Sequence, residues 1–292
     1  MRRAATTATE ARIMHRDQVE PASDTCWDPE RYLQFAGLRR RPSEELLDRL
    51  PALSPTSIVD LGCGTGLATQ LLAEKWPDAD LVGVDSSRQM LEEAARTGLP
   101  ARWICADVAH WQPAWRPGLI FAAAVMHFVG EHRLLLPHLL RQLGPGGCLA
   151  LHMPDWRDAP WYQIALDVLE TGGPAGRPLG PDPLRTAMAE RNVQPVDHYY
   201  RLLAPLATEI DIWESSHLQV VHGDNPVFDW VSVSALRPVL NGLSPSCRQR
   251  FLEQYIRHIR EQYPPERNGA TLFPFRRIFL VARVPGGAAA LH

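Results

Sequence analysis

Residues 59–66 read VDLGCGTG, an aspartate followed by glycines at three alternate positions. The run that leads into this stretch, SIVDLG (57–62), is short, apolar and partly β-branched, which predicts a buried strand. The residues that follow, LATQLLAEKW (67–76), have the pattern of a helix, and ADLVGVDSS (79–87) predicts a second strand. A strand, a helix and a strand in about 30 residues form a βαβ unit, so this stretch indicates a parallel sheet.

The same alternation of strands and helices continues to residue 155. Upstream, Pro42 and Ser43 with two following glutamates predict the start of a helix that ends near Pro51. Short, solid apolar strands that alternate with helices are typical of a mostly parallel sheet with both faces covered. We therefore predict a doubly wound α/β fold. The further elements expected in this half are a helix at 87–97, strands at 101–108 and 119–126, a helix at 131–143 and a strand at 148–154.

Beyond Pro154 the pattern changes to helices separated by a Gly- and Pro-rich loop at 171–183. Two late strands are expected to join the same sheet, so we interpret the helices between them as a cap over the strand ends. The elements predicted here are strands at 207–221 and 276–284 and helices at 226–240 and 245–262. The domains expected are a leader at 1–26, disordered or forming a lid, a ligand-binding α/β core at 27–155, the cap with the final strands at 156–284, and a tail at 285–292.

The composition is that of an ordinary globular protein, because 45% of the 292 residues are hydrophobic and 22% are charged. A formal net charge of −3 without a basic run argues against a nucleic-acid partner. No apolar stretch approaches the roughly 20 residues that cross a bilayer, so we expect no membrane partner and a cytoplasmic protein. The five cysteines form no C-x-x-C pair, which indicates neither disulfides nor a metal site. A small molecule is the expected ligand.

The glycine turn can be compared with known phosphate-binding turns. Gly62, Gly64 and Gly66 allow the backbone to approach a ligand beneath a helix N-terminus. A P-loop is excluded because no Gly-Lys-Ser/Thr follows the turn. A dinucleotide site fits poorly, because the spacing is G-x-G-x-G and Asp60 would lie where a pyrophosphate approaches.

Aspartates lie at the ends of three successive predicted strands. The first of them precedes the glycine turn, and an acid at this position suits a cationic ligand. Asp85, with Ser86 beside it, ends the second strand, where a carboxylate accepts hydrogen bonds from both hydroxyls of a ribose. Asp107 ends the third strand, in position for the exocyclic amine of an adenine, and Val108 can pack on the adenine ring. Acids at the carboxyl ends of successive parallel strands converge on one crevice of the sheet. These residues therefore predict a single ligand site.

This D-x-G-x-G-x-G turn, the ribose acid and the acid followed by an apolar residue resemble the cofactor motifs of the class I S-adenosylmethionine-dependent methyltransferases. The resemblance implies a Rossmann-like sheet of the seven-stranded type, S-adenosyl-L-methionine as cofactor and a small-molecule acceptor. It also implies that Ala123 and Ala124 lie beside the methionine end of the cofactor. Segments throughout residues 27–283 are similar to the trans-aconitate 2-methyltransferase family. They include WDPERYLQF, RRRP, GVDSSRQML, HWQP, IFAAAV, HMPD, VDHYYRLL, IDIWESS, ALRPVL, EQYP and FRRIFLVAR.

The chain departs from that family where the acceptor is expected to bind. Glu214 replaces an arginine, and this change has the largest consequence, because a tricarboxylate such as trans-aconitate calls for guanidinium groups. A glutamate suits an amine or a hydroxyl instead, so we predict that trans-aconitate is not the physiological acceptor. The other changes are Ala123 for an amide, His127 for Gln, Phe128 for Trp, His152 for Gln, Trp156 for Asn, and His217 and Leu218 for two tyrosines.

Methyl transfer from a sulfonium requires alignment and, for a protonated nucleophile, a base. His127 is the first candidate for this base, before Tyr200, Glu214 and Tyr32. Two of these residues have structural alternatives, since His127 can be a core histidine and Glu214 can face solvent.

An aromatic cluster follows the strand at 148–154. Trp156, Trp161 and Tyr162 can surround a sulfonium or an ammonium by cation–π contact, or they can simply be the core of the cap. The residues expected in the substrate pocket are Phe128, His152, Trp156, Trp161, Tyr162 and His217.

Two other functions use the same predicted site. In a cyclase, the amino group of S-adenosylmethionine would attack its own γ-carbon, expel methylthioadenosine and form azetidine-2-carboxylate without a second substrate. In a non-catalytic accessory protein, the cofactor would bind without turnover. Incubation with S-adenosylmethionine alone distinguishes these alternatives from a methyltransferase.

Overall fold

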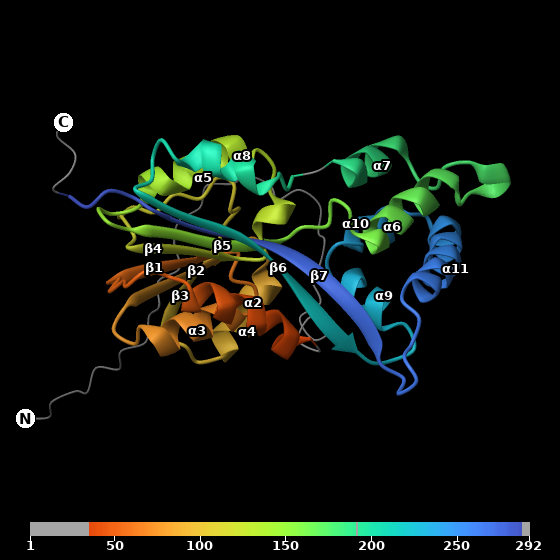
Figure 1. The fold of residues 1–292 in the computed structure, drawn as a ribbon, viewed down its shortest axis with the longest axis horizontal. Helices are drawn as coiled ribbons and strands as arrows, with labels where there is room; N and C mark the ends of the chain where they lie inside the picture. The colour runs from red at the N-terminus through yellow and green to blue at the C-terminus, as the bar shows by residue number, and fades with distance from the viewer. Residues whose placement is uncertain (1–34, 191, 288–292) are drawn as a thin grey trace, which may run out of the picture.

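One mixed sheet forms the centre of the fold (Figure 1). The structure is a computed structural model that describes residues 35–190 and 192–287. Within these residues, seven strands pair in the order β3-β2-β1-β4-β5-β7-β6, all parallel except β7, which runs antiparallel to both of its neighbours. This confirms the predicted doubly wound, Rossmann-like sheet. The strands are β1 (Ser57–Leu61), β2 (Asp80–Asp85), β3 (Ala101–Cys105), β4 (Leu119–Ala123), β5 (Cys148–Pro154), β6 (Glu209–Val221) and β7 (Thr271–Arg283).

Helices cover both faces of the sheet, because its central strands are apolar on both sides. β5 is buried along its whole length. In β1, Ile58 packs into the core beneath α2 and α3, whereas Val59 packs into the core beneath α5 and α8. Figure 1 shows α4 beside α2 and α3 on the first of these faces. These helices are α2 (Ala36–Asp48), α3 (Leu67–Lys75), α4 (Arg88–Arg96), α5 (His132–Gln142) and α8 (Val196–Leu203).

The remaining helices form a cap at one end of the sheet, on the right of Figure 1. β7 is longer than β5, so its first half and the facing part of β6 extend beyond the sheet centre to the cap. Trp161, Trp230 and Phe273 are buried in a core that belongs to the cap. The cap helices are α6 (Pro160–Thr171), α7 (Asp182–Ala189), α9 (Pro226–Ser232), α10 (Arg237–Gly242) and α11 (Pro245–Gln262), with a short 3-10 turn at Pro174–Gly176.

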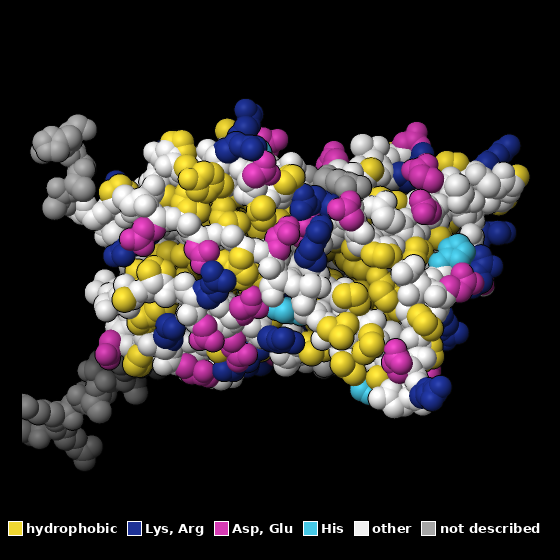
Figure 2. Space-filling model, in the orientation of Figure 1, with side chains coloured by type: hydrophobic (Ala, Val, Ile, Leu, Met, Phe, Trp, Pro, Cys, Tyr) yellow, Lys and Arg dark blue, Asp and Glu magenta, His cyan; other side chains and the backbone are white. Residues whose placement is uncertain are grey.

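The ribbon formed by β6 and β7 has one exposed face. Leu218 and Val220 of β6 and Leu272 of β7 are 53%, 51% and 37% exposed. Figure 2 shows hydrophobic side chains gathered where this ribbon runs toward the cap. His217 and Gln219 are buried on the opposite face. Because side chains of a strand alternate between faces, even-numbered residues in this part of β6 point outward.

The helix expected to start at Pro42 begins earlier, at Ala36, and Pro42 lies inside it. Residues at the start of this helix contact the cap. The rings of Phe35 and Trp230 are 5.0 Å apart, and the Arg39 guanidinium lies 4.7 Å from the centre of the Trp230 ring. Tertiary packing of this kind outweighs the local cost of a proline within a helix.

The strand expected at 119–126 ends earlier, at Ala123. Ala124 has φ 52°, a left-handed conformation that cannot continue a strand. A 3-10 turn, η1 (Met126–Phe128), follows and contains His127.

Later elements also differ in their ends. The helix expected at 226–240 is two helices, α9 and α10, and β7 begins at Thr271 rather than at residue 276. The earlier start of β7 follows from its pairing with β6, which continues to the Val221–Thr271 pair. The predicted leader (1–26) lies outside the described residues. No helix among the described residues is long and apolar enough to cross a bilayer.

Candidate active site

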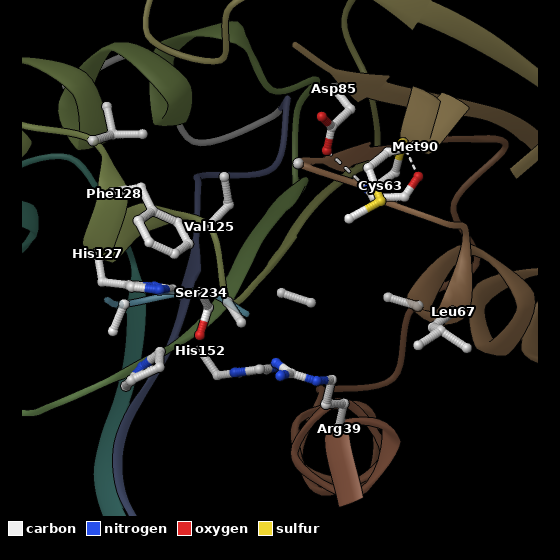
Figure 3. A pocket seen from close by; sticks show the side chains of 18 of the residues that line it. Arg39, Cys63, Leu67, Asp85, Met90, Val125, His127, Phe128, His152 and Ser234 are labelled. Atoms are coloured by element: carbon white, nitrogen blue, oxygen red, sulfur yellow. Dashed lines mark hydrogen bonds between the residues drawn. The ribbon is translucent and has the colours of Figure 1, made fainter. Parts of the chain in front are cut away.

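A cavity of about 410 Å³ lies between the carboxyl ends of the parallel strands and the cap. Open α/β sheets bind ligands at this position. One part is lined by Gly64, Asp85 and Asp107, and we call it the acidic side. Another part is lined by Arg39, Arg237 and Arg277, and we call it the basic side. Figure 3 shows Asp85 and Arg39 on different sides of this space.

The glycine turn places backbone atoms without side chains at the acidic side of the cavity. Gly62 and Gly64 have φ values of 76° and 54°, which favour glycine. A Cβ at Gly62 would lie 2.4 Å from the Val125 side chain, so no larger residue fits there. A Cβ at Gly64 would meet no atom within 4 Å, so this residue presents its backbone to open space. Gly66 does not line the cavity; it precedes α3 and packs near the Trp103 ring.

Two of the predicted aspartates line the acidic side. The Asp85 carboxylate accepts hydrogen bonds from the backbone N–H groups of Gly64 (2.9 Å) and Ser87 (2.8 Å). Burial raises the pKa of Asp85, and these hydrogen bonds oppose that effect. Asp107 accepts a hydrogen bond from the Ala109 N–H (2.9 Å), and its side chain is 63% exposed. Ser86 and Val108 line the cavity between them, so the structure brings these four residues together.

Asp60 lies behind the glycine turn rather than in the cavity. It is 1% exposed, and its Oδ2 accepts a hydrogen bond from the Thr69 hydroxyl at 2.6 Å. Burial raises the pKa of Asp60 to about 7, and the negative charge of Asp85 contributes. The expectation that Asp60 meets a cationic ligand directly is therefore not supported by its position. Its carboxyl group instead ties the end of β1 to α3.

A group of aromatic residues also lines the cavity. The His127 ring centre lies 3.9 Å from that of Phe128 and 4.8 Å from that of Trp156, which it meets edge-on. Trp161 lies 5.6 Å beyond Trp156, and all four line the cavity. Figure 3 shows the His127 side chain directed into this space. Ala123 and Ala124 also line the cavity, as expected.

Two histidines of the cavity are buried, and burial favours their neutral forms. Burial lowers the pKa of His127 well below its usual value, and the positive charge of Arg277 lowers it further. The same two causes act on the pKa of His152. His152 Nε2 lies 3.2 Å from the Ser43 hydroxyl, whereas Nδ1 of each histidine has no hydrogen-bond partner among the described residues.

The basic side was not predicted from the sequence. Arg39 comes from α2, Arg237 starts α10, and Arg277 lies in β7, where it is only 3% exposed. The signal that could have identified Arg277 is the alternation along β7. Phe273 and Phe275 are buried, so Arg277 falls on the same inward face. No comparable local pattern marks the other two arginines.

Arg40 also lines the cavity, but acidic residues surround its guanidinium group. Its Nε lies 2.7 Å from Glu44, and its Nη2 lies 3.0 Å from Glu74. These partners raise the pKa of Arg40. The positive charge of Arg40 is therefore balanced by these two glutamates.

Glu214 does not line the cavity, contrary to the prediction. Its side chain is 40% exposed and lies 3.8 Å from the Arg157 guanidinium. Glu214 occupies an even-numbered, outward-facing position of β6. The argument that an acid replaces an arginine in the acceptor pocket therefore does not hold.

Three other predicted residues lie outside the cavity. Tyr200 is 57% exposed on α8, which argues against a role as base. His217 is buried, and its Nε2 lies 2.6 Å from the Glu45 carboxylate. The Tyr162 hydroxyl donates to the Met188 carbonyl, so this tyrosine supports Trp156 from behind. Tyr32 lies outside the described residues.

No metal site appears in the part of the chain that the structure describes. Nowhere in residues 35–190 and 192–287 do three or more His, Cys, Asp or Glu side chains form a group that could hold a metal ion.

Comparison with known proteins agrees with the fold and the site. Residues 58–147 match the family described as "Methyltransferase domain". The trans-aconitate 2-methyltransferase of Pseudomonas paraeruginosa (strain DSM 24068 / PA7) is 58% identical over 260 residues, which cover 89% of this chain and 94% of that protein. The enzyme of the same name from Azoarcus sp. (strain BH72) is 42% identical over 258 residues, covering 88% and 98%.

Solved structures support the fold alone. A protein of Bacillus halodurans C-125 superposes with a TM-score of 0.52 at 15% identity and covers 84% of this chain and 99% of its own. The YcgJ protein of Bacillus subtilis gives 0.50 at 13% identity, covering 87% and 99%. The sequence relatives, in contrast, are similar over nearly their whole length. The chain therefore belongs to the trans-aconitate 2-methyltransferase family, within the class I S-adenosylmethionine-dependent methyltransferases.

Proposed function

We propose that this enzyme transfers a methyl group from S-adenosylmethionine to a carboxylate oxygen of a small polycarboxylate. The observation that carries the proposal is the basic side of the cavity, which Arg39, Arg237 and Arg277 line. Guanidinium groups match carboxylates in charge and in geometry. The names of the relatives support this class of acceptor, so trans-aconitate is the first compound to test.

The acidic side fits the cofactor. The open backbone at Gly64 leaves room for the ligand, and the Asp85 carboxylate is oriented by two N–H groups. We infer that Asp85 binds the ribose hydroxyls, that Asp107 binds the adenine amine and that Val108 packs on the adenine ring. Ala123 and Ala124 would lie beside the methionine end. When bound, S-adenosylmethionine supplies a methyl group on an electrophilic sulfonium and leaves as S-adenosylhomocysteine.

A carboxylate acceptor does not require the protein to supply a base. Carboxyl groups have pKa values near 4, so the acceptor is already ionised at neutral pH and no base is required. One acceptor oxygen forms a C–O bond with the methyl carbon as the C–S bond breaks, and the electron pair of that bond goes to sulfur. The arginines would hold the acceptor in line for this displacement. His127, whose pKa is lowered well below its usual value, would not act as a base in this reaction.

The cyclase and accessory-protein hypotheses predict different products from S-adenosylmethionine. A cyclase has no second substrate, so three arginines would face only the carboxylate of the cofactor itself. An accessory protein would bind the cofactor without turnover. We therefore favour the methyltransferase, and the products formed from S-adenosylmethionine alone separate the three cases.

The test incubates the enzyme with S-adenosylmethionine, with and without trans-aconitate and other polycarboxylates, and identifies products by mass spectrometry. The expected result is S-adenosylhomocysteine and a methyl ester only when an acceptor is present. Arg39→Gln should raise the KM for the acceptor by roughly tenfold to a hundredfold, as expected for lost charge-assisted hydrogen bonds. Arg41→Gln is the control, because Arg41 is exposed on the same helix and does not line the cavity. Methylthioadenosine from S-adenosylmethionine alone would overturn the proposal.

A further inference from the structure

We infer that the preferred acceptor carries a hydroxyl group in addition to its carboxylates. This inference rests on the proposed function and specifies the acceptor of the same site. The observation is a pair of buried imidazoles, His127 and His152, which line the cavity beside the arginines of the basic side.

The aromatic residues around His127 fix its ring in place. It is 5% exposed, and its ring lies between those of Phe128 and Trp156. Its Nδ1 is buried without a hydrogen bond to any described residue. The turn that carries it is held by Asn192, whose side-chain amide donates to the His127 carbonyl at 3.3 Å. The ring therefore brings to the cavity wall a polar group that no described residue satisfies.

His152 lies on β5, beside the strand that precedes this turn, and it also has one ring nitrogen without a partner among the described residues. It pairs with Ala123 in the β4–β5 register and is 1% exposed. Its Nε2 is close to the Ser43 hydroxyl, and its Nδ1 has no partner among the described residues. The positive charge of Arg277 acts on both histidines and favours their neutral forms.

A neutral imidazole needs two kinds of partner, because one ring nitrogen donates a hydrogen bond and the other accepts one. A carboxylate only accepts, so it can satisfy the arginines and an imidazole N–H but never the accepting nitrogen. A hydroxyl both donates and accepts. A buried acceptor left without a donor is costly, and sites built to bind a hydroxyl discriminate against analogues that lack it. The combination of arginines and neutral histidines therefore matches a hydroxylated polycarboxylate.

The test compares kcat/KM for tricarboxylates with and without a hydroxyl group. Citrate and isocitrate carry one, whereas trans-aconitate and tricarballylate do not. We expect at least one of the hydroxylated acids to exceed both others by roughly tenfold to a hundredfold. Equal values, or higher values for the acids without a hydroxyl, would overturn the inference while leaving carboxylate methylation intact. Failure to methylate any of the four would count against the proposed function itself.

Variants of His127 test whether its imidazole causes the preference for hydroxylated acids. His127→Phe keeps an aromatic ring beside Trp156 and should remove most of the preference, chiefly by lowering kcat/KM for the hydroxylated acid. His127→Asn retains a donor and an acceptor and should restore part of it. His138→Phe is the control, because His138 lies on α5, outside the cavity. An undiminished preference in a folded His127→Phe enzyme would contradict the inference, and circular dichroism establishes that this variant is folded.

Discussion

At the scale of single residues, two backbone hydrogen bonds orient the Asp85 carboxylate in the cavity wall. Its two carboxylate oxygens accept hydrogen bonds from Gly64 N and Ser87 N, which fix the plane of the group. Each oxygen still has lone pairs for further donors. The carboxylate thereby links the glycine turn to the end of β2 and faces the cavity beside both.

Asp85→Ala is expected to raise the Kd for S-adenosylmethionine by at least about tenfold, because each lost hydrogen bond to a charged group contributes about 1.5–3 kcal/mol. Isothermal titration calorimetry measures this change. Asp80→Ala is the matched control, since Asp80 is exposed at the other end of the same strand, and it should leave the Kd unaltered. An unaltered Kd in Asp85→Ala would remove the ribose assignment.

At the scale of elements, the turn η1 is held from behind by a buried histidine. His132 Nε2 lies 2.8 Å from the Met126 carbonyl, which can only accept, so this nitrogen carries the proton. Since burial favours neutral His132, its Nδ1 accepts a hydrogen bond from the Tyr199 hydroxyl at 2.9 Å. That hydroxyl in turn accepts from the Gln194 N–H at 2.9 Å. The chain of hydrogen bonds orients a cavity wall without touching the cavity.

Tyr199→Phe should therefore affect the acceptor more than the cofactor. We expect kcat/KM for the acceptor to fall by roughly five- to tenfold, the effect of one lost buried hydrogen bond, with the Kd for S-adenosylmethionine nearly constant. Steady-state kinetics and calorimetry measure the two quantities separately. Tyr200→Phe, at the exposed neighbouring position of α8, should change neither. Equal losses in cofactor and acceptor binding would indicate general destabilisation instead of positioning.

The elements also explain which parts of the site are predictable from sequence. Asp85 ends β2, and Gly64 and Asp107 come shortly after the ends of β1 and β3, so their meeting at one sheet edge follows from local pattern and the parallel pairing. Glu214 lies within a strand, where a shift of one position reverses the face of every side chain. Its resemblance to a family position could not reveal that it points outward, because pairing with β7 decides the face.

At the scale of the whole molecule, the cavity exists because the cap and the sheet have separate cores that meet at an edge. The sheet has one core on each face, and the cap has its own. The arginines of the basic side come from α2, α10 and β7, so more than 200 residues separate the first from the last in the sequence. Only tertiary packing brings them together, which is why the sequence pattern did not predict this half of the site.

Burial of titratable side chains also makes the stability of the whole molecule depend on pH. The two histidines of the cavity and Asp60 change the stability in opposite directions. His127 and His152 have pKa values lowered by burial, so below about pH 6.5 the unfolded chain binds protons that the folded chain does not bind until the pH reaches the lowered pKa. Their contribution to stability is complete above the unfolded pKa near 6.5 and is lost as the pH falls. Asp60 acts oppositely, because its folded pKa is about 7 and its unfolded pKa is near 4. Its contribution is complete at low pH and is lost as the pH rises toward 7.

These opposing signs predict opposite effects of two substitutions on the pH dependence of unfolding. His127→Phe should reduce the slope of the unfolding free energy against pH between pH 5 and 6.5, and Asp60→Asn should increase it, each by up to about 1.4 kcal/mol per pH unit. Asparagine at position 60 can still accept the Thr69 hydrogen bond, so the change isolates the charge. Urea unfolding at several pH values measures these slopes, with His138→Phe as the control for replacing a histidine outside the cavity. If both variants shifted the slope in the same direction, the assignment of a neutral histidine and a protonated aspartate in the folded protein would be wrong.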